Sequence, residues 1–155
     1  MLIYNRTSWV NMVGDVVAYV TFNFNGLTYQ EVTSGTGKTW MDRNLGATQV
    51  ATSSTDADSY GDLYQWGKAQ AFTSAYNTAN NIAGTVDDTA AAGTSFITNN
   101  GDWLSTVTTD QTTNNARWNS GSEGTPVKVV ANDPCPSGFR VPTLTELQAE
   151  RDNGG

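Results

Sequence analysis

Residues 133–146 read "DPCPSGFRVPTLTE", the most informative stretch of this chain. It contains the only cysteine of the sequence, Cys135, between Pro134 and Pro136. The two prolines hold the backbone extended around the sulfur, and Gly138 allows the chain to turn directly afterwards. Such a rigid setting favours a structural role for the segment over catalysis.

The end of the same stretch predicts the start of a helix. Thr143 stands at the N-cap position and Glu146 at the third helical position, which together form a capping box. We expect the helix to bury Leu144 and Leu147 and to end near Arg151.

The chemistry open to Cys135 is limited by the rest of the composition. Histidine is absent, which removes Ser-His-Asp and Cys-His catalysis and imidazole metal sites. A single cysteine makes neither an internal disulfide nor a thiolate zinc cluster. A catalytic thiol is disfavoured because no histidine can activate it, whereas a free, buried and inert thiol stays open. Arg140, five residues on, is placed to reach a carboxylate or a carbonyl.

The 155 residues are enough for one domain with a core. Charged residues make up only 15% of the chain, and turn-forming residues take their place, which favours a strand-and-loop domain with few helices. The net charge of −7 disfavours nucleic acid and anionic membranes as partners. No apolar run approaches the ~20 residues of a membrane span. Asn5 and Arg6 interrupt any apolar region of a secretory signal, so no signal peptide is expected.

The N-terminal part predicts a β-hairpin over residues 16–32. Apolar residues alternate from Val16 to Phe24, so one face of the strand should be buried, and Asn25-Gly26 supplies a tight turn. Farther on, 37–39 reads Gly-Lys-Thr, the tail of a phosphate-binding loop. The first glycine of that motif is replaced by Val32 and no helical pattern follows, so we expect a glycine turn and then a short strand from Trp40.

The middle of the chain is less regular. Leu63, Trp66 and Ala69 follow helical spacing with Asp62 as a cap, which predicts a short helix, and we expect Tyr64 and Trp66 to pack in the core. Residues 73–132 predict long loops pinned by buried tryptophans, with one more strand near residue 127.

An acidic cluster is a further candidate site. Asp56, Asp58 and Asp62 stand at alternate positions near a glycine, a pattern that can coordinate calcium through oxygen atoms. The glutamate that would close a calcium-binding loop is missing, so solvated loop carboxylates are the favoured interpretation.

Three blocks carry a resemblance to a known family: "GKTWMDRNLGA" (37–47), "YGDLYQWGKA" (60–69) and "DPCPSGFRVPTLTEL" (133–147). With "DW" at 102–103 and "RW" at 117–118, they resemble the Fibrobacter succinogenes major paralogous domain of bacterial surface proteins and phage virion proteins. The resemblance implies an α+β, loop-rich, C-type-lectin-like fold of the branch shared with formylglycine-generating enzymes. It divides the chain into an N-terminal β-hairpin segment, 1–33, and the lectin-like domain, 34–155. The scaffold residues it implies are Trp40, Asn44, Leu45, Gly61, Tyr64, Trp66, Pro136, Gly138, Arg140, Pro142 and Glu146.

The resemblance also implies a partner for Cys135. Members of the family continue past the capping-box helix to a closing strand with a second cysteine, so Cys135 would form a structural disulfide outside this segment. On that basis we expect the domain to be incomplete at its C-terminus: truncated, completed by another chain, or a degenerate variant.

The function that these observations favour is non-catalytic recognition. We expect an extracellular, cell-surface or virion-surface adhesion module that binds a cell-surface glycan or protein, without a cofactor unless calcium binds. The alternative is a structural virion decoration, fibre or filament subunit that associates with itself or with neighbouring subunits. An enzyme of the formylglycine-generating type is disfavoured, because that chemistry needs a pair of cysteines.

Overall fold

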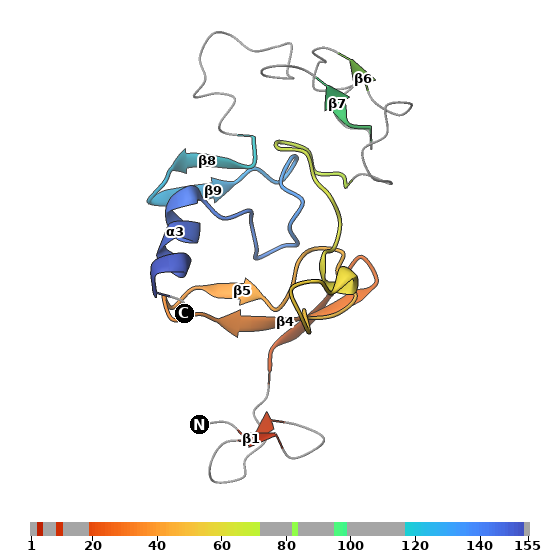
Figure 1. The fold of residues 1–155 in the computed structure, drawn as a ribbon. Helices are drawn as coiled ribbons and strands as arrows, with labels where there is room; N and C mark the ends of the chain where they lie inside the picture. The colour runs from red at the N-terminus through yellow and green to blue at the C-terminus, as the bar shows by residue number, and fades with distance from the viewer. Residues whose placement is uncertain are drawn as a thin grey trace.

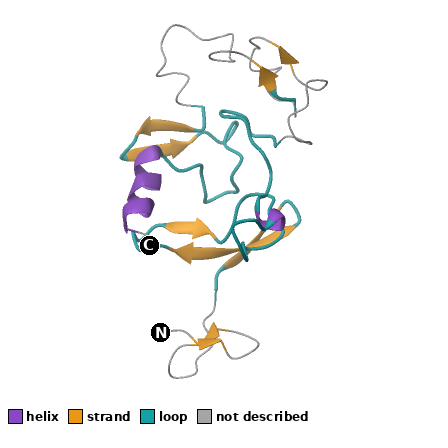
Figure 2. Cartoon of the chain, viewed as in Figure 1, coloured by secondary structure: helices purple, strands orange, loops and turns teal. Residues whose placement is uncertain are grey.

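The chain forms small sheets and one described helix, linked by long loops (Figure 1). The structure is a computed structural model; it describes residues 19–71, 95–98 and 117–153 in full and residues 3–4, 9–10 and 82–83 by their backbone. Within them the chain is α+β and loop-rich, as predicted (Figure 2). The elements are β1 (Ile3–Tyr4), β2 (Trp9–Val10), β3 (Thr21–Phe24), β4 (Leu27–Thr33), β5 (Thr39–Met41), the 3₁₀ turn η1 (Ala57–Ser59), β6 (Ile82–Ala83), β7 (Ile97–Thr98), β8 (Asn119–Ser122), β9 (Thr125–Lys128) and α3 (Leu144–Asn153).

The predicted β-hairpin is confirmed as β3 and β4. The two strands pair antiparallel with Phe24 opposite Leu27, and the turn residues Asn25 and Gly26 have φ of 49° and 79°. Both angles lie in the left-handed region that this tight turn requires. Strand β3 begins later than expected: Val20 precedes it and is 59% exposed, so the prediction of a buried residue there is wrong. Residues 16–18 lie outside the described residues.

A second turn, over 34–38, joins β4 to β5. Gly37 has a φ of 78°, and Thr39 begins a strand, so the glycine turn predicted in place of a phosphate-binding loop is confirmed. Strands β3, β4 and β5 form one three-stranded antiparallel sheet. The proposed division at residue 33 stays a prediction, and β4 and β5 pair across it.

An aromatic stack joins this sheet to the C-terminal part. The Phe22 ring stacks on Tyr29 at 5.7 Å between centroids and on Phe139 at 5.0 Å. Tyr29 is 1% exposed, and the Arg43 guanidinium lies 4.6 Å above its ring. Among the described hydrophobic residues, only Tyr29, Ala47 and Ile97 are fully buried. The apolar core of the described part is therefore small, and polar contacts must hold much of the remainder.

Helix α3 begins with the predicted capping box. Thr143 Oγ1 accepts from the Glu146 backbone N–H at 3.3 Å, and Glu146 Oε2 accepts from the Thr143 N–H at 3.0 Å. The prediction that the helix buries its leucines is wrong: Leu144 is 65% and Leu147 50% exposed, and Glu146 is the buried residue. The helix is held by charged partners rather than by apolar contact, and it runs to Asn153.

The helix bridges two sheets (Figure 1). At its start, Glu123 in the β8–β9 turn accepts from the Thr145 N–H at 3.3 Å. Toward its end, Glu150 accepts at one oxygen, Oε1, from Ser34 at 2.8 Å and from Thr36 in the β4–β5 turn. Because both ends are tied, α3 sets the spacing between the β8–β9 hairpin and the three-stranded sheet.

The helix predicted around Asp62 to Ala69 is wrong. Its residues form turns and an isolated β-bridge between Tyr64 and Ala71. Gly67 has a φ of 79°, which no right-handed helix accommodates. The neighbouring Arg117, 8% exposed, donates to the Gly67 carbonyl at 3.0 Å and packs against that glycine.

The strand predicted near residue 127 is confirmed as β9, paired with β8. Its Val127 is 58% exposed. Trp118, expected to be buried, is half-buried and donates from Nε1 to the Lys68 carbonyl at 3.2 Å. Ile97 in β7 is buried, whereas Trp103, another tryptophan of the predicted loops, lies outside the described residues.

Candidate functional site

The loop that carries Cys135 is braced by two buried or half-buried charges. Asp133, 4% exposed, accepts from the Cys135 N–H at Oδ1 and from the Val141 N–H at Oδ2, each at 2.8 Å. Lys128 donates to the carbonyls of Pro136 at 2.9 Å and Phe139 at 2.8 Å, and also to that of Cys135. The loop is therefore closed on itself by Asp133 and anchored to β9 by Lys128.

A second ionic group ties this loop to α3 and to β5. Arg140 makes a bidentate pair with Glu146, at 2.8 and 2.6 Å, and donates to the Val141 carbonyl at 3.2 Å, so it reaches both kinds of partner that were expected as alternatives, a carboxylate and a carbonyl. Lys38, the last residue of the turn before β5, lies 3.0 Å from the same carboxylate. The Arg140 guanidinium first of all, together with the Thr143 N–H and Lys38, lowers the pKa of Glu146 to about 2. Glu146 is thus held as a carboxylate at the centre of three segments.

Trp40 is fixed by α3 as well. Its indole Nε1 donates to Glu150 Oε1 at 2.9 Å, the same oxygen that receives the Ser34 and Thr36 hydroxyls. These bonds, the one from Thr36 first, lower the pKa of Glu150. The orientation of the Trp40 ring follows from this anchor and from the pairing of β5 with β4.

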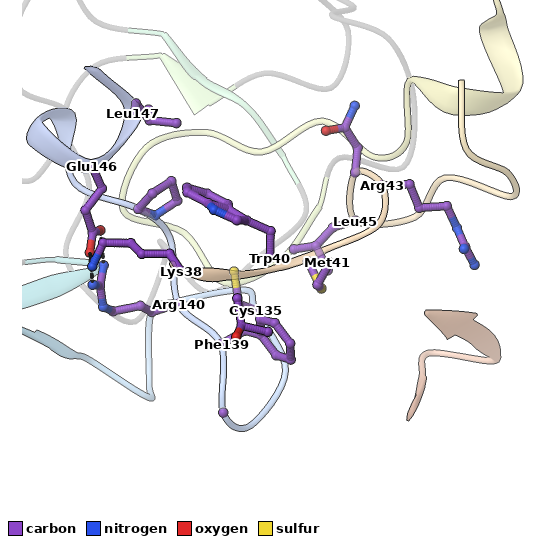
Figure 3. A pocket seen from close by; sticks show the side chains of 14 residues that line it. Lys38, Trp40, Met41, Arg43, Leu45, Cys135, Phe139, Arg140, Glu146 and Leu147 are labelled. Carbon is purple, nitrogen blue, oxygen red and sulfur yellow. Dashed lines mark hydrogen bonds and ion pairs between the residues drawn. The ribbon is translucent and has the colours of Figure 1, made fainter. Parts of the chain in front are cut away.

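Between β5, the 135–142 loop and α3 lies a cavity of about 560 Å³ (Figure 3). Many residues that the sequence resemblance implied as scaffold line it, from two blocks almost a hundred residues apart in the chain. They are Trp40, Asn44, Leu45, Gly138, Arg140, Pro142 and Glu146, and Cys135, the disulfide candidate, lies among them. The structure therefore brings the first and third blocks of the resemblance together around one hollow.

The charged residues at this cavity are already paired with one another. Glu146 holds Lys38 and Arg140, and Arg43 donates to Asp42 at 2.7 Å and to the Ala47 carbonyl at 3.0 Å. The other contributors are largely apolar: Trp40, Met41, Leu45, Phe139, Pro142 and Leu147. The hollow thus combines an apolar wall with a rim of neutralised charges.

Cys135 contributes its sulfur to this wall (Figure 3). The thiol is free, and burial first, then the Asp133 carboxylate, raises its pKa to about 12. A thiol in that state is a poor nucleophile. The disulfide to a cysteine outside this segment stays a prediction.

The remaining scaffold residues lie around the cavity rather than in it. Gly61 has a φ of 70°, and a Cβ there would stand 2.2 Å from the Leu45 carbonyl, so glycine is required where the two segments touch. Tyr64 is half-buried, and burial first, then Asp62, raises its pKa to about 12. Pro136 is buried and lines a neighbouring hollow beside Phe22 and Phe139. Trp66 is 36% exposed, so the prediction that it packs in the core is wrong.

Trp66 lies instead on a second hollow, of about 590 Å³, beside β8. Trp118 and the start of α3 complete its wall. Pro142 and Leu147 line both hollows, so the two adjoin along the first turn of the helix.

The acidic cluster does not form a calcium site. Asp56 accepts from the Thr52 N–H at 3.0 Å, the Thr52 hydroxyl at 2.8 Å and the Gln49 amide at 2.9 Å, and it caps η1 through the Asp58 N–H. These bonds, those from Thr52 first, lower its pKa. Asp62 packs over Gly46. Within the described ranges no three acidic, histidine or cysteine residues gather to hold a metal ion.

Sequence reasoning missed the residues that brace the cavity loop. Asp133 opens the quoted stretch, and Lys128 is the one charged residue of the predicted strand near 127, yet neither was singled out. Lys38 was read only as part of a rejected phosphate loop, and Glu150 was not considered. A lysine in a short strand just before a proline-rich loop was the one signal that its ammonium group could donate to the backbone carbonyls of that loop.

Comparison with protein-family models, curated proteins and solved structures finds no match to this chain. In the part of the chain that the structure describes, no helix is long and apolar enough to cross a membrane.

Proposed function

We propose that this chain is a non-catalytic recognition or adhesion module, displayed outside a cell or on a virion surface, that binds glycan or protein on a cell surface. Its fold is a C-type-lectin-like shell related to the Fibrobacter succinogenes major paralogous domain. The observation that carries the proposal is the convergence of the 37–47 and 133–147 blocks on one preformed hollow of about 560 Å³.

The state of the groups around this hollow supports binding rather than catalysis. The thiol of Cys135 has a pKa raised to about 12, and Glu146 is paired twice. A general acid or base needs a pKa near the working pH, and a nucleophile must be ionised or activated. A rigid frame with neutralised charges and an apolar wall is suited to hold a ligand in place.

The test is direct binding. The purified chain is titrated on a glycan array and against intact cells, with solubilised cell-surface protein as the competitor. Saturable binding to either class supports recognition. Binding to neither, by a chain whose tertiary structure is intact by near-UV circular dichroism, contradicts it.

A structural virion or filament subunit is the second candidate. It is favoured by the large apolar side chains exposed on the C-terminal part: Leu144 and Leu147 of α3, Val127 of β9 and Val130 just after it. Several exposed apolar side chains are typical of a surface covered by protein. Analytical ultracentrifugation separates the candidates: concentration-dependent assembly, lost in a Leu144→Gln/Leu147→Gln variant, favours the subunit, and a monomer at all concentrations excludes it.

A further inference from the structure

The hollow beside β8 is built differently from the cavity around Cys135. It lies between the turn at Trp66, the turn at Trp118, strand β8 and the first turn of α3, and measures about 590 Å³. We call it the tryptophan groove. Its lining residues are Trp66, Trp118, Asn119, Ser120, Gly121, Ser122, Glu123, Pro126, Val141, Pro142, Thr143, Leu144 and Leu147.

The two tryptophans of this groove are positioned by contacts between their own turns. Trp118 donates from its indole to the Lys68 carbonyl at 3.2 Å, and Arg117 donates to the Gly67 carbonyl at 3.0 Å. The two turns, about fifty residues apart in the chain, are therefore fastened to each other. Trp66 stays 36% exposed on this frame, which leaves much of a large aromatic ring at the surface. Rings held in advance lose little conformational freedom when a ligand stacks on them.

Polar groups also line the groove. Ser120, Ser122 and Thr143 bring hydroxyls, and Glu123 brings a carboxylate. Asn119 donates from Nδ2 to the Val141 carbonyl at 2.7 Å, which fixes the amide, while its Oδ1 is buried and without a hydrogen-bond partner. An unpaired buried acceptor is unfavourable, and a hydroxyl from a bound molecule, directly or through a water, would remove that penalty.

The charge of the groove narrows the class of ligand. Among the described residues that line it, none is a lysine or an arginine, and the only charged side chain is Glu123. Phosphates, sulfates and acidic sugars would find no cation there and would meet a carboxylate. The whole chain, with a net charge of −7, adds to this repulsion.

We propose that the tryptophan groove binds a neutral saccharide. The apolar face of a sugar ring stacks on the indoles of Trp66 and Trp118, and its hydroxyls bond to Glu123, Asn119 and the serine hydroxyls of β8. A neutral peptide is the competing occupant, and the hydroxyl-rich and amide-lined side of the groove favours the sugar. This assignment rests on the proposed recognition function and names the ligand class for it.

The experiment uses the intact chain and a defined panel of probes. Neutral tetrasaccharides of glucose, galactose and N-acetylglucosamine, a sialylated trisaccharide and an uncharged Gly-Ser tetrapeptide are titrated by ligand-observed NMR and by tryptophan fluorescence. We expect at least one neutral saccharide to bind. Trp66→Ala and Trp118→Ala should each weaken it by about tenfold. Tyr60→Ala is the matched control, because Tyr60 is 56% exposed and does not line the groove.

Each outcome of these titrations either supports or overturns the saccharide assignment. Trp118→Ala also removes the hydrogen bond to the Lys68 carbonyl and can therefore unfold the chain. If Trp118→Ala unfolds, the proposal is judged on Trp66→Ala alone. No neutral saccharide binding, preference for the sialylated or peptide probe, or equal binding by wild type and Trp66→Ala overturns the saccharide assignment. The proposed function is tested separately on cells: attachment without saccharide binding leaves recognition standing and removes this inference. Saccharide binding without attachment upholds the saccharide assignment and contradicts only the cell surface as the place of the target.

Discussion

The two sides of helix α3 carry opposite chemistry. The inward side presents Glu146 and Glu150, which bond to Arg140, Lys38 and the Trp40 indole. The outward side presents Leu144 and Leu147, which are at least half exposed and line the hollow beside β8. An ordinary surface helix has the reverse arrangement, with apolar residues inside and charges in water. The comparison teaches that directional charge pairs dock this helix, so its leucines stay partly exposed at the edge of the two hollows.

The largest effect is expected from breaking the inward side. Glu146→Gln removes one charge from a group of three and leaves Arg140 half-buried without its anion. We expect the free energy of unfolding to fall by about 3 kcal/mol. Urea unfolding followed by circular dichroism measures it. Asp152→Asn, on the same helix but in an exposed pair with Arg151, is the control and should cost no more than about 0.5 kcal/mol. Equal effects of the two variants would contradict the assignment.

The same contrast predicts how stability depends on pH. Glu146 has a pKa of about 2 in the folded chain and an ordinary value of 4.5 when unfolded. A carboxyl group with a lowered pKa stabilises the fold above its unfolded pKa, and this contribution is lost as pH falls toward the folded value. Stability should therefore drop between about pH 5 and pH 2, by up to about 3 kcal/mol from this group.

Urea titrations at several pH values in that range test this dependence. Glu146→Gln should show a visibly flatter profile than wild type, because the titrating group is gone. A variant with the same slope as wild type would mean that other carboxyl groups carry the effect.

The aromatic stack of Phe22, Tyr29 and Phe139 provides an apolar contact between the three-stranded sheet and the loop that carries Cys135. Phe139→Ala removes the ring that stacks on Phe22 at 5.0 Å. Because both rings are only half-buried, we expect a loss of about 2 kcal/mol, below that of a fully buried phenylalanine. Thermal and urea unfolding measure the loss, with the exposed Tyr60→Ala as the control. If Phe139→Ala lowered the free energy of unfolding more than Glu146→Gln, the aromatic contact and not the charge pairs would be the stronger of the two.

Cys135 should matter less to stability, and Cys135→Ala is expected to lower the free energy of unfolding by about 1 kcal/mol in urea titrations.

The raised pKa of the Cys135 thiol makes a second, sharper prediction for wild type. At pH 8 a disulfide reagent such as 5,5′-dithiobis(2-nitrobenzoate) should react with the folded thiol at least about a hundredfold more slowly than in urea. Equal rates in the two states would show an accessible, ionised sulfur.

The smallest effect on stability is expected on the outward side. Leu144→Gln/Leu147→Gln should change the free energy of unfolding by no more than about 0.5 kcal/mol, because these side chains are 65% and 50% exposed. Urea unfolding checks it. A loss of several kcal/mol would show that the leucines are buried in solution, and the comparison between the two sides of α3 would fail.

Local patterns in the sequence predicted well where neighbouring residues decide the outcome. The hairpin turn requires two residues in the left-handed conformation, which Asn25 and Gly26 adopt. Thr143 and Glu146 form a capping box within a single helical turn. The bond from Arg140 to Glu146 also spans one loop. Prediction failed where distant segments intervene: Gly67 is held in a left-handed conformation beside Arg117, so the helical spacing around it never forms a helix.

The candidate site shows the same division. Most of the scaffold residues that the sequence predicted in the 37–47 and 133–147 blocks line the cavity. The sequence predicts Trp66 in the core because a large aromatic side chain more often packs inside than binds a ligand. Trp66 is 36% exposed in a turn whose Gly67 is bonded to Arg117, fifty residues away, and no local pattern encodes that contact.

By itself, the sequence determined the turns, the start of the last helix and the rigid setting of Cys135, because each depends on backbone preferences within a few residues. Only the tertiary structure decided which side of that helix faces inward, since the choice depends on Lys38 and Trp40, a hundred residues away, meeting Glu146 and Glu150. A helix with both leucines and carboxylates offers two ways to dock. The positions of the opposing charges select between them.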